Sequence, residues 1–72
     1  MLAVDRKKIE VYQAVKGIST NQLIHKSGLT EKTVQNLKNG KPCRPTSVYK
    51  LAKSLGVDVT EILKESEGAD ND

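Results

Sequence analysis

The stretch STNQLIHKSGLTEKTVQNLKNG, residues 19–40, decides the interpretation of the whole chain because it contains two sets of helix boundary signals. Ser19 and Gln22 are spaced as in a capping box, in which each side chain binds the backbone N–H of the other residue. They predict a helix over about 20–27. Gly28 is expected to end it, because glycine readily adopts the left-handed conformation that terminates helices.

A second short helix is expected directly afterwards. Thr30 is a favourable N-cap for a helix over about 31–39, which ends at the pair Asn39-Gly40. Two short helices joined by a three- or four-residue turn with a glycine form the helix-turn-helix arrangement. The sequence therefore predicts this arrangement within residues 19–40.

The residues before these two helices predict one further helix, over about 5–16. Ile9, Tyr12 and Val15 are spaced to lie on its inner face, and Gly17 is placed to cap its C-terminus. This helix would supply part of the core on which the other two helices rest.

Two more helices are expected after residue 40. The prolines of the loop at 41–45 oppose helix formation, and a fourth helix is expected over about 46–55, ending at Gly56. Asp58 and Glu61 have capping-box spacing and predict a fifth helix. The inward side chains of these two helices are expected to be Val48, Leu51, Ala52, Leu55, Val59, Ile62 and Leu63. No segment alternates polar and apolar residues over a useful length, so the predicted fold class is all-α with five helices.

Charge is distributed unevenly along the 72 residues, which suffice for one domain. Residues 1–64 contain all 12 lysines and arginines and five acidic residues, a net charge of +7, whereas residues 65–72 contain four acidic residues and no basic one. We expect a folded domain over 1–65 and a disordered acidic tail over 66–72. A basic body favours a polyanionic partner, although a solubilising surface would carry the same charge.

Several functional classes are disfavoured. A domain of this size has little room for a deep substrate pocket, and the sequence has no nucleophile–base pair, so we expect no enzyme, cofactor or small-molecule ligand. Cys43 has no disulfide partner, and His25 has no Cys or His at ligand spacing, so no metal site is expected. No apolar run is long enough to cross a membrane, and a cytoplasmic protein is predicted.

The predicted helix over 31–39 has two unlike faces. At about 100° per residue, Val34 and Leu37 fall on one side. The opposite side collects hydrogen-bonding side chains, which are Lys32, Gln35, Asn36 and Asn39, with Glu31 at its edge. Asn and Gln can bind adenine through two hydrogen bonds, and Lys can donate to guanine O6 and N7. An ordinary solvated face would also be polar, but it usually mixes Glu and Lys pairs.

The segments beside this face offer candidates for contacts to phosphate. The N-terminus of the 20–27 helix has unpaired backbone N–H groups, and Ser19 and Thr20 lie there. Lys41 and Arg44 follow the 31–39 helix. Phosphate contacts position a protein on a duplex whereas base contacts select the sequence, and this chain has candidates for both.

The stretch GLTEKTVQNLKNGKPCRPTSVYKLAKSLGVDVTEIL (28–63) resembles the lambdoid phage repressor and Cro family, also called the XRE-like helix-turn-helix family. The likeness covers roughly residues 5–64. The residues that match at family spacing are Gly28, Val34, Leu37, Asn39, Gly40, Arg44, Pro45, Leu51, Ala52, Leu55, Gly56 and Val57. The resemblance implies a five-helix, lambda repressor-like domain that binds double-stranded operator DNA as a homodimer, with the 31–39 helix in the major groove.

The same resemblance implies a bacterial or phage-encoded transcriptional regulator, a repressor or an activator, with roles for individual residues. Glu31, Lys32 and Asn36 match base-reading positions, and Gln35 lies beside them. The family's positions that contact the DNA backbone are matched by Thr20, Asn39, Lys41, Arg44 and Thr46. By analogy with the family, dimerisation is expected through the fifth helix and the corner at 56–59.

The sequence also departs from the family. Gln13 and Lys38 occupy positions where many members place an Arg and a Glu that pair, and the absence of both together suggests that the pair has been replaced rather than damaged. Ile24 stands where a small residue is usual, which would splay the helix crossing, and Ser27 replaces an apolar residue. Glu31 would repel phosphate at the leading edge of its helix, but it could accept a hydrogen bond from cytosine N4.

A protein-interaction module with the same fold, such as an antitoxin or adaptor, is the alternative function. It would present an apolar face on the 31–39 helix, and the amides and the lysine there disfavour it. Ile24 and the acidic tail leave it open.

Overall fold

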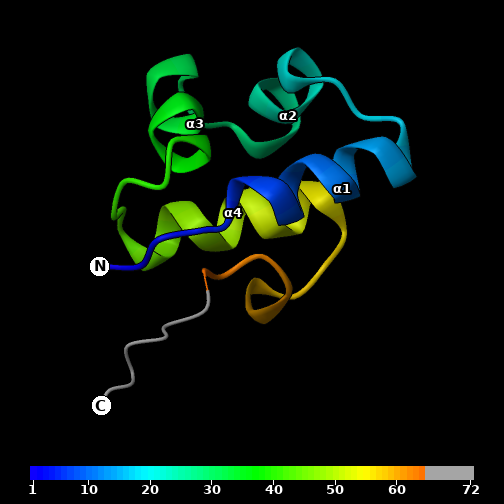
Figure 1. Cartoon of the computed structure of the whole chain (residues 1–72). Coiled ribbons are helices and arrows are strands. Elements are labelled where there is room, and N and C mark those ends of the chain that lie inside the picture. The colour runs from blue at the N-terminus through cyan, green and yellow to red at the C-terminus, as the bar shows by residue number, and fades with distance from the viewer. Residues whose placement is uncertain (65–72) are drawn as a thin grey trace.

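The computed structural model describes residues 1–64, which form four α-helices and one turn of 3-10 helix. Their bounds are α1 Arg6–Lys16, α2 Thr20–Ser27, α3 Glu31–Lys38, α4 Pro45–Leu55 and η1 Val59–Glu61. In Figure 1, α2 and α3 lie above α1 and α4, and η1 lies below them. The predicted all-α class is confirmed, and the described residues contain no β-strand.

Local capping explains where the helices start and stop. Asp5 precedes α1 and accepts a hydrogen bond from the Lys7 backbone N–H at 2.9 Å. The capping box of Ser19 and Gln22 is formed as predicted, with both hydrogen bonds present. Thr30 caps α3 by accepting from the backbone of Thr33. Each cap satisfies backbone N–H groups that have no partner inside the helix.

The core is small, entirely apolar and centred on α4. Ten hydrophobic side chains are buried, and no polar or charged side chain among the described residues is buried with them. The core residues of α4 are the four predicted ones, Val48, Leu51, Ala52 and Leu55. The contributions of the other elements are Val4, Ile9, Leu23, Val34, Leu37 and Ile62.

The N-terminal segment makes two isolated β-bridges that the sequence did not predict. Leu2 pairs with Cys43 through two backbone hydrogen bonds of 2.8 and 2.7 Å, and Val4 is bridged to Leu63. Val4 is also buried in the core. Residues 1–4 therefore connect the loop before α4 to the segment after η1.

The fifth helix is reduced to the three residues of η1. The Asp58 side chain makes no capping bond, and the Glu61 carboxylate instead accepts from the Tyr12 hydroxyl at 2.9 Å. The chain leaves the helical path because Ile62 and Lys64 form backbone hydrogen bonds with residues 3–5. Of the three side chains predicted to face inward in this segment, Ile62 is buried, whereas Val59 and Leu63 are half-buried.

The Tyr12–Glu61 contact also changes an ionisation equilibrium. The hydrogen bond to the Glu61 carboxylate, with a smaller effect of desolvation, raises the pKa of the Tyr12 phenol above its ordinary value of 10.0. Ionising the phenol would remove its donor hydrogen and place two negative charges side by side.

Two further predictions about the helices were wrong. Val15 was expected to face inward, but its side chain is 72% exposed, because six residues at about 100° each place it about 120° around α1 from the buried Ile9. Pro45 was placed in the loop, but it is the first residue of α4. Proline suits this first position, since its fixed φ is helical and its missing N–H would have had no partner there.

Within residues 1–64, no helix is long and apolar enough to cross a membrane. The same residues contain no group of three or more His, Cys, Asp or Glu side chains that could hold a metal ion. The predicted acidic tail, 66–72, lies outside the described residues.

Candidate nucleic-acid interface

Helix α3 is anchored on one face and open on the other. Val34 and Leu37 have no exposed surface, so the helix is fixed to the core through these two side chains. On the opposite side Glu31, Lys32 and Gln35 are exposed and Asn36 is half-exposed. The hydrogen-bonding edge predicted from the sequence therefore faces outward in the folded chain.

The four predicted base-reading residues form two different pairs along this edge. Gln35 donates through Nε2 to Glu31 Oε2 at 3.3 Å, which joins two exposed side chains one helical turn apart. Lys32 and Asn36 are also one turn apart, but neither side chain has a hydrogen bond or ion pair to the described residues. Their donors and acceptors are thus available to a ligand.

The turn between α2 and α3 is held by Ser27, the residue that departs from the family's apolar preference. Its hydroxyl donates to the Ile24 carbonyl at 3.3 Å and accepts from the Leu29 backbone N–H at 3.2 Å. Gly28 between them has φ +74°, a left-handed conformation that glycine adopts without strain. The side chain of Ser27 therefore stabilises the turn between α2 and α3 through two hydrogen bonds.

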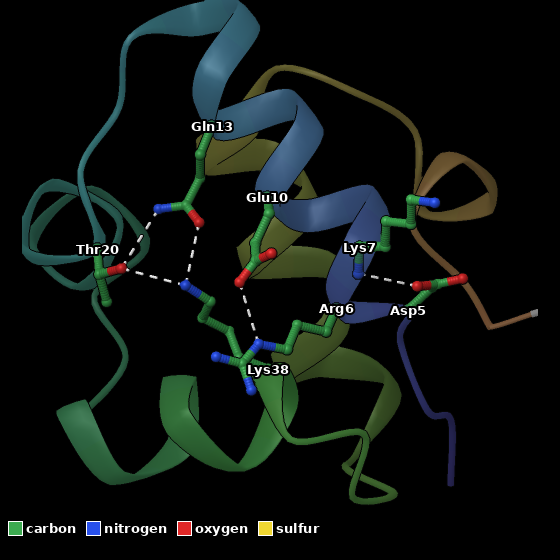
Figure 2. Close-up of polar contacts among 7 residues, drawn as sticks. All are labelled: Asp5, Arg6, Lys7, Glu10, Gln13, Thr20 and Lys38. Carbon is green, nitrogen blue, oxygen red and sulfur yellow. Dashed lines mark hydrogen bonds and ion pairs between the residues drawn. The ribbon is translucent and has the colours of Figure 1, made fainter.

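A cluster of three polar side chains joins α1, α2 and α3, and we call it the polar junction: Gln13, Thr20 and Lys38 (Figure 2). Lys38 donates to Gln13 Oε1 at 3.1 Å and to Thr20 Oγ1 at 3.2 Å. Gln13 Nε2 donates to Thr20 Oγ1 at 3.4 Å and to the Ile18 carbonyl at 3.2 Å. The junction occupies the positions at which the resemblance implies an Arg–Glu ion pair in many family members, and all three side chains are half-buried.

The residues assigned to phosphate lie at both ends of the helix pair. Ser19 and Thr20 stand at the start of α2. Beyond α3, the exposed residues are Asn39, Lys41, Arg44 and Thr46. Of these six residues, Ser19 and Thr20 already use their hydroxyl oxygens as acceptors, from Gln22 and from the polar junction. Their hydroxyl hydrogens remain as possible donors.

The loop after α3 has a fixed backbone. The Lys41 N–H donates to the Asn36 carbonyl at 3.0 Å, and Gly40 has φ +80°. Cys43 is paired with Leu2 through its backbone. Arg44, directly after it, is exposed, so the loop presents a cation from an ordered segment.

The sequence interpretation missed Lys38 as a candidate for the interface. It noted Lys38 as a departure from the family, without a role. The available signal was the simultaneous change at position 13, because a neutral partner leaves the charge of Lys38 uncompensated.

A separate hollow lies at the corner where a dimer contact was expected. It is lined by Tyr49, Lys53, Gly56, Val57, Asp58, Val59 and Thr60. Tyr49 is 55% exposed there, and Val57 and Val59 are half-buried. This corner combines apolar side chains with a concave surface.

Comparison with known proteins agrees with the geometry. Residues 8–66 match the family model of the Cro/C1-type HTH DNA-binding domain. No curated protein sequence and no solved structure gave a significant match. The matched segment contains all four α-helices except the first two residues of α1, together with η1. The resemblance inferred from the sequence is thereby confirmed, and the chain belongs to the family of Cro/C1-type helix-turn-helix DNA-binding domains.

Proposed function

We propose that the protein is a transcriptional regulator that recognises a specific double-stranded DNA operator by inserting α3 into the major groove. The observation that carries this proposal is the outward edge of α3, where Lys32 and Asn36 have no partner within residues 1–64. The anchor formed by Val34 and Leu37 fixes the direction of that edge. Family membership supports DNA as the ligand.

Base reading is assigned to four side chains of α3. Asn36 offers a donor and an acceptor that fit adenine N7 and N6, and Lys32 offers donors that fit guanine O6 and N7. Glu31 can accept from cytosine N4. Gln35 already donates to Glu31, so we propose that these two side chains contact DNA as a unit.

Contacts to the DNA backbone are assigned to residues at both ends of the helix pair. These residues are Ser19, Thr20, Asn39, Lys41, Arg44 and Thr46. They would fix the register of α3 in the groove without selecting a sequence.

We also propose that the protein binds DNA as a homodimer through the corner of residues 56–59. The hollow beside Tyr49 and the half-buried Val57 and Val59 support this choice of surface. A two-fold dimer would place two copies of α3 about one helical turn of DNA apart and would require a pseudo-palindromic operator. We place this function in the cytoplasm of a bacterium, with the gene carried by the bacterium or by a phage.

The experiment that tests the function is selection of bound sites from a random duplex pool. We expect enrichment of a pseudo-palindromic sequence, and an affinity whose logarithm falls steeply with the logarithm of salt concentration. A pool that stays random after several rounds, with no binding at low salt, would reject a DNA-binding regulator and favour the protein-interaction alternative.

A further inference from the structure

Lys38 is a cation without an anionic partner in residues 1–64. Its ammonium group contacts the neutral oxygens of Gln13 and Thr20 at 3.1 and 3.2 Å, and the one ion pair in these residues joins Arg6 to Glu10. The side chain is half-buried at the meeting point of three helices. Removing part of an ammonium group from water is unfavourable unless an anion compensates for it.

The hydrogen bonds of the polar junction leave two donors unused. Thr20 Oγ1 accepts from Gln13 Nε2 and from Lys38 Nζ, which occupy both of its lone pairs. The hydroxyl hydrogen of Thr20 must then point elsewhere. The ammonium group of Lys38 has three hydrogens, of which two are directed to Gln13 and Thr20.

We propose that Lys38 and Thr20 together form a binding site for one phosphate of the DNA backbone, with Gln13 as the positioning residue. This site rests on the proposed function and adds Lys38 to it. The spare N–H and O–H come from neighbouring atoms, so both can reach the same phosphate oxygens. A hydrogen bond from an ammonium to a phosphate is charge-assisted, and no carboxylate within residues 1–64 pairs with Lys38 to weaken it.

The position of the junction makes this contact useful for recognition. Thr20 is the first residue of α2 and Lys38 is the last residue of α3. A phosphate held between them is tied to both helices of the motif at once, so it fixes the angle of α3 in the groove. The Arg–Glu pair of many family members would be neutral overall at this place, whereas Gln13 and Lys38 leave one positive charge.

The test compares Lys38→Met with the unmodified full chain on a mixed-sequence duplex, since phosphate contacts do not depend on sequence. Losing one phosphate contact per protomer should reduce the slope of log affinity against log salt by about 0.9 for each protomer bound. For each protomer bound, affinity should fall about eightfold at ~0.1 M salt, and the loss should shrink as salt rises. The conservative variant Lys38→Arg keeps the charge and should restore most of the slope.

Lys7→Met is the matched control, because it also removes one lysine charge. Lys7 is exposed, and Figure 2 shows it on the opposite side of α1 from the polar junction. Its salt slope should equal that of the unmodified chain. A folded Lys38→Met variant with an unchanged slope would overturn the phosphate site while leaving DNA binding intact.

A second measurement covers the case in which Lys38→Met does not fold. In the unmodified protein, the ¹⁵N signal of the Lys38 ammonium should shift on addition of duplex and keep its hydrogens longer against exchange with water. An unshifted signal in the saturated complex would also overturn the site. Absence of any duplex binding by the unmodified chain would instead reject the proposed function itself.

Discussion

At the scale of single residues, we expect Asn36 to select the base pair at one position of the operator. Its amide has no partner in residues 1–64, while its neighbours Val34 and Leu37 hold the backbone in place. We expect Asn36→Ala to cost about 1–3 kcal/mol of binding free energy at one base pair. Binding to operators mutated at each position in turn measures this, and an equal loss on every sequence would contradict the role.

We expect Arg44, unlike Asn36, to contribute to binding independently of the DNA sequence. It is exposed and makes no side-chain hydrogen bond in the described residues, although it is the N-cap residue of α4. Arg44→Ala should weaken binding to all duplexes alike and lower the salt slope by about 0.9 for each protomer bound, with little change in thermal stability. Lys50→Ala, which removes a cation from an exposed site elsewhere on α4, is the control. A sequence-dependent loss for Arg44→Ala would assign it to base reading instead.

At the scale of helices, the sequence predicted those features that depend on neighbouring residues. The capping box of Ser19, the left-handed glycines and the inward positions of α3 and α4 all follow from local spacing, and they are present. The boundary at Pro45 was missed because the same residue can close a loop or open a helix. The inward face predicted for α1 was too wide, because six residues at about 100° each place Val15 about 120° around the helix from Ile9.

The exposure of Val15 leads to a stability prediction for α1. Val15 is 72% exposed in a helix, where its branched side chain loses rotamer freedom without gaining burial. Val15→Ala should therefore stabilise the fold by about 0.5 kcal/mol. Ile9→Ala, at a position with no exposed surface, should instead cost about 2–5 kcal/mol. Urea unfolding of both variants measures this contrast, and a destabilised Val15→Ala variant would contradict it.

At the scale of the whole molecule, the sequence was least informative about contacts between distant segments. The shortened fifth helix and the pairing of residues 2–4 arise together, since backbone groups after η1 bond to the N-terminal segment. The polar junction joins residues as far apart as 13 and 38. None of these partners can be read from local spacing, although the paired change at Gln13 and Lys38 was a visible hint.

The contact between Tyr12 and Glu61 should make stability depend on alkaline pH. The pKa of Tyr12 is raised in the fold, so the unfolded chain loses this proton at lower pH than the folded chain does. The stabilising contribution is complete below pH 10 and is lost as pH rises through the higher folded pKa. Tyr12→Phe should therefore lower the Tm at pH 8 and flatten its decline above pH 10. An equal decline in both proteins would contradict this.

The two bridges of the N-terminal segment have a mechanical consequence for the surface assigned to DNA. Leu2 is hydrogen-bonded to Cys43, the residue directly before Arg44, and Val4 is bridged to Leu63 beyond η1. Fraying of the first four residues would break both bridges, and would thereby loosen the loop that carries Arg44 and the segment that follows η1. We therefore expect removal of residues 1–4 to weaken both DNA binding through Arg44 and the proposed dimer contact at residues 56–59.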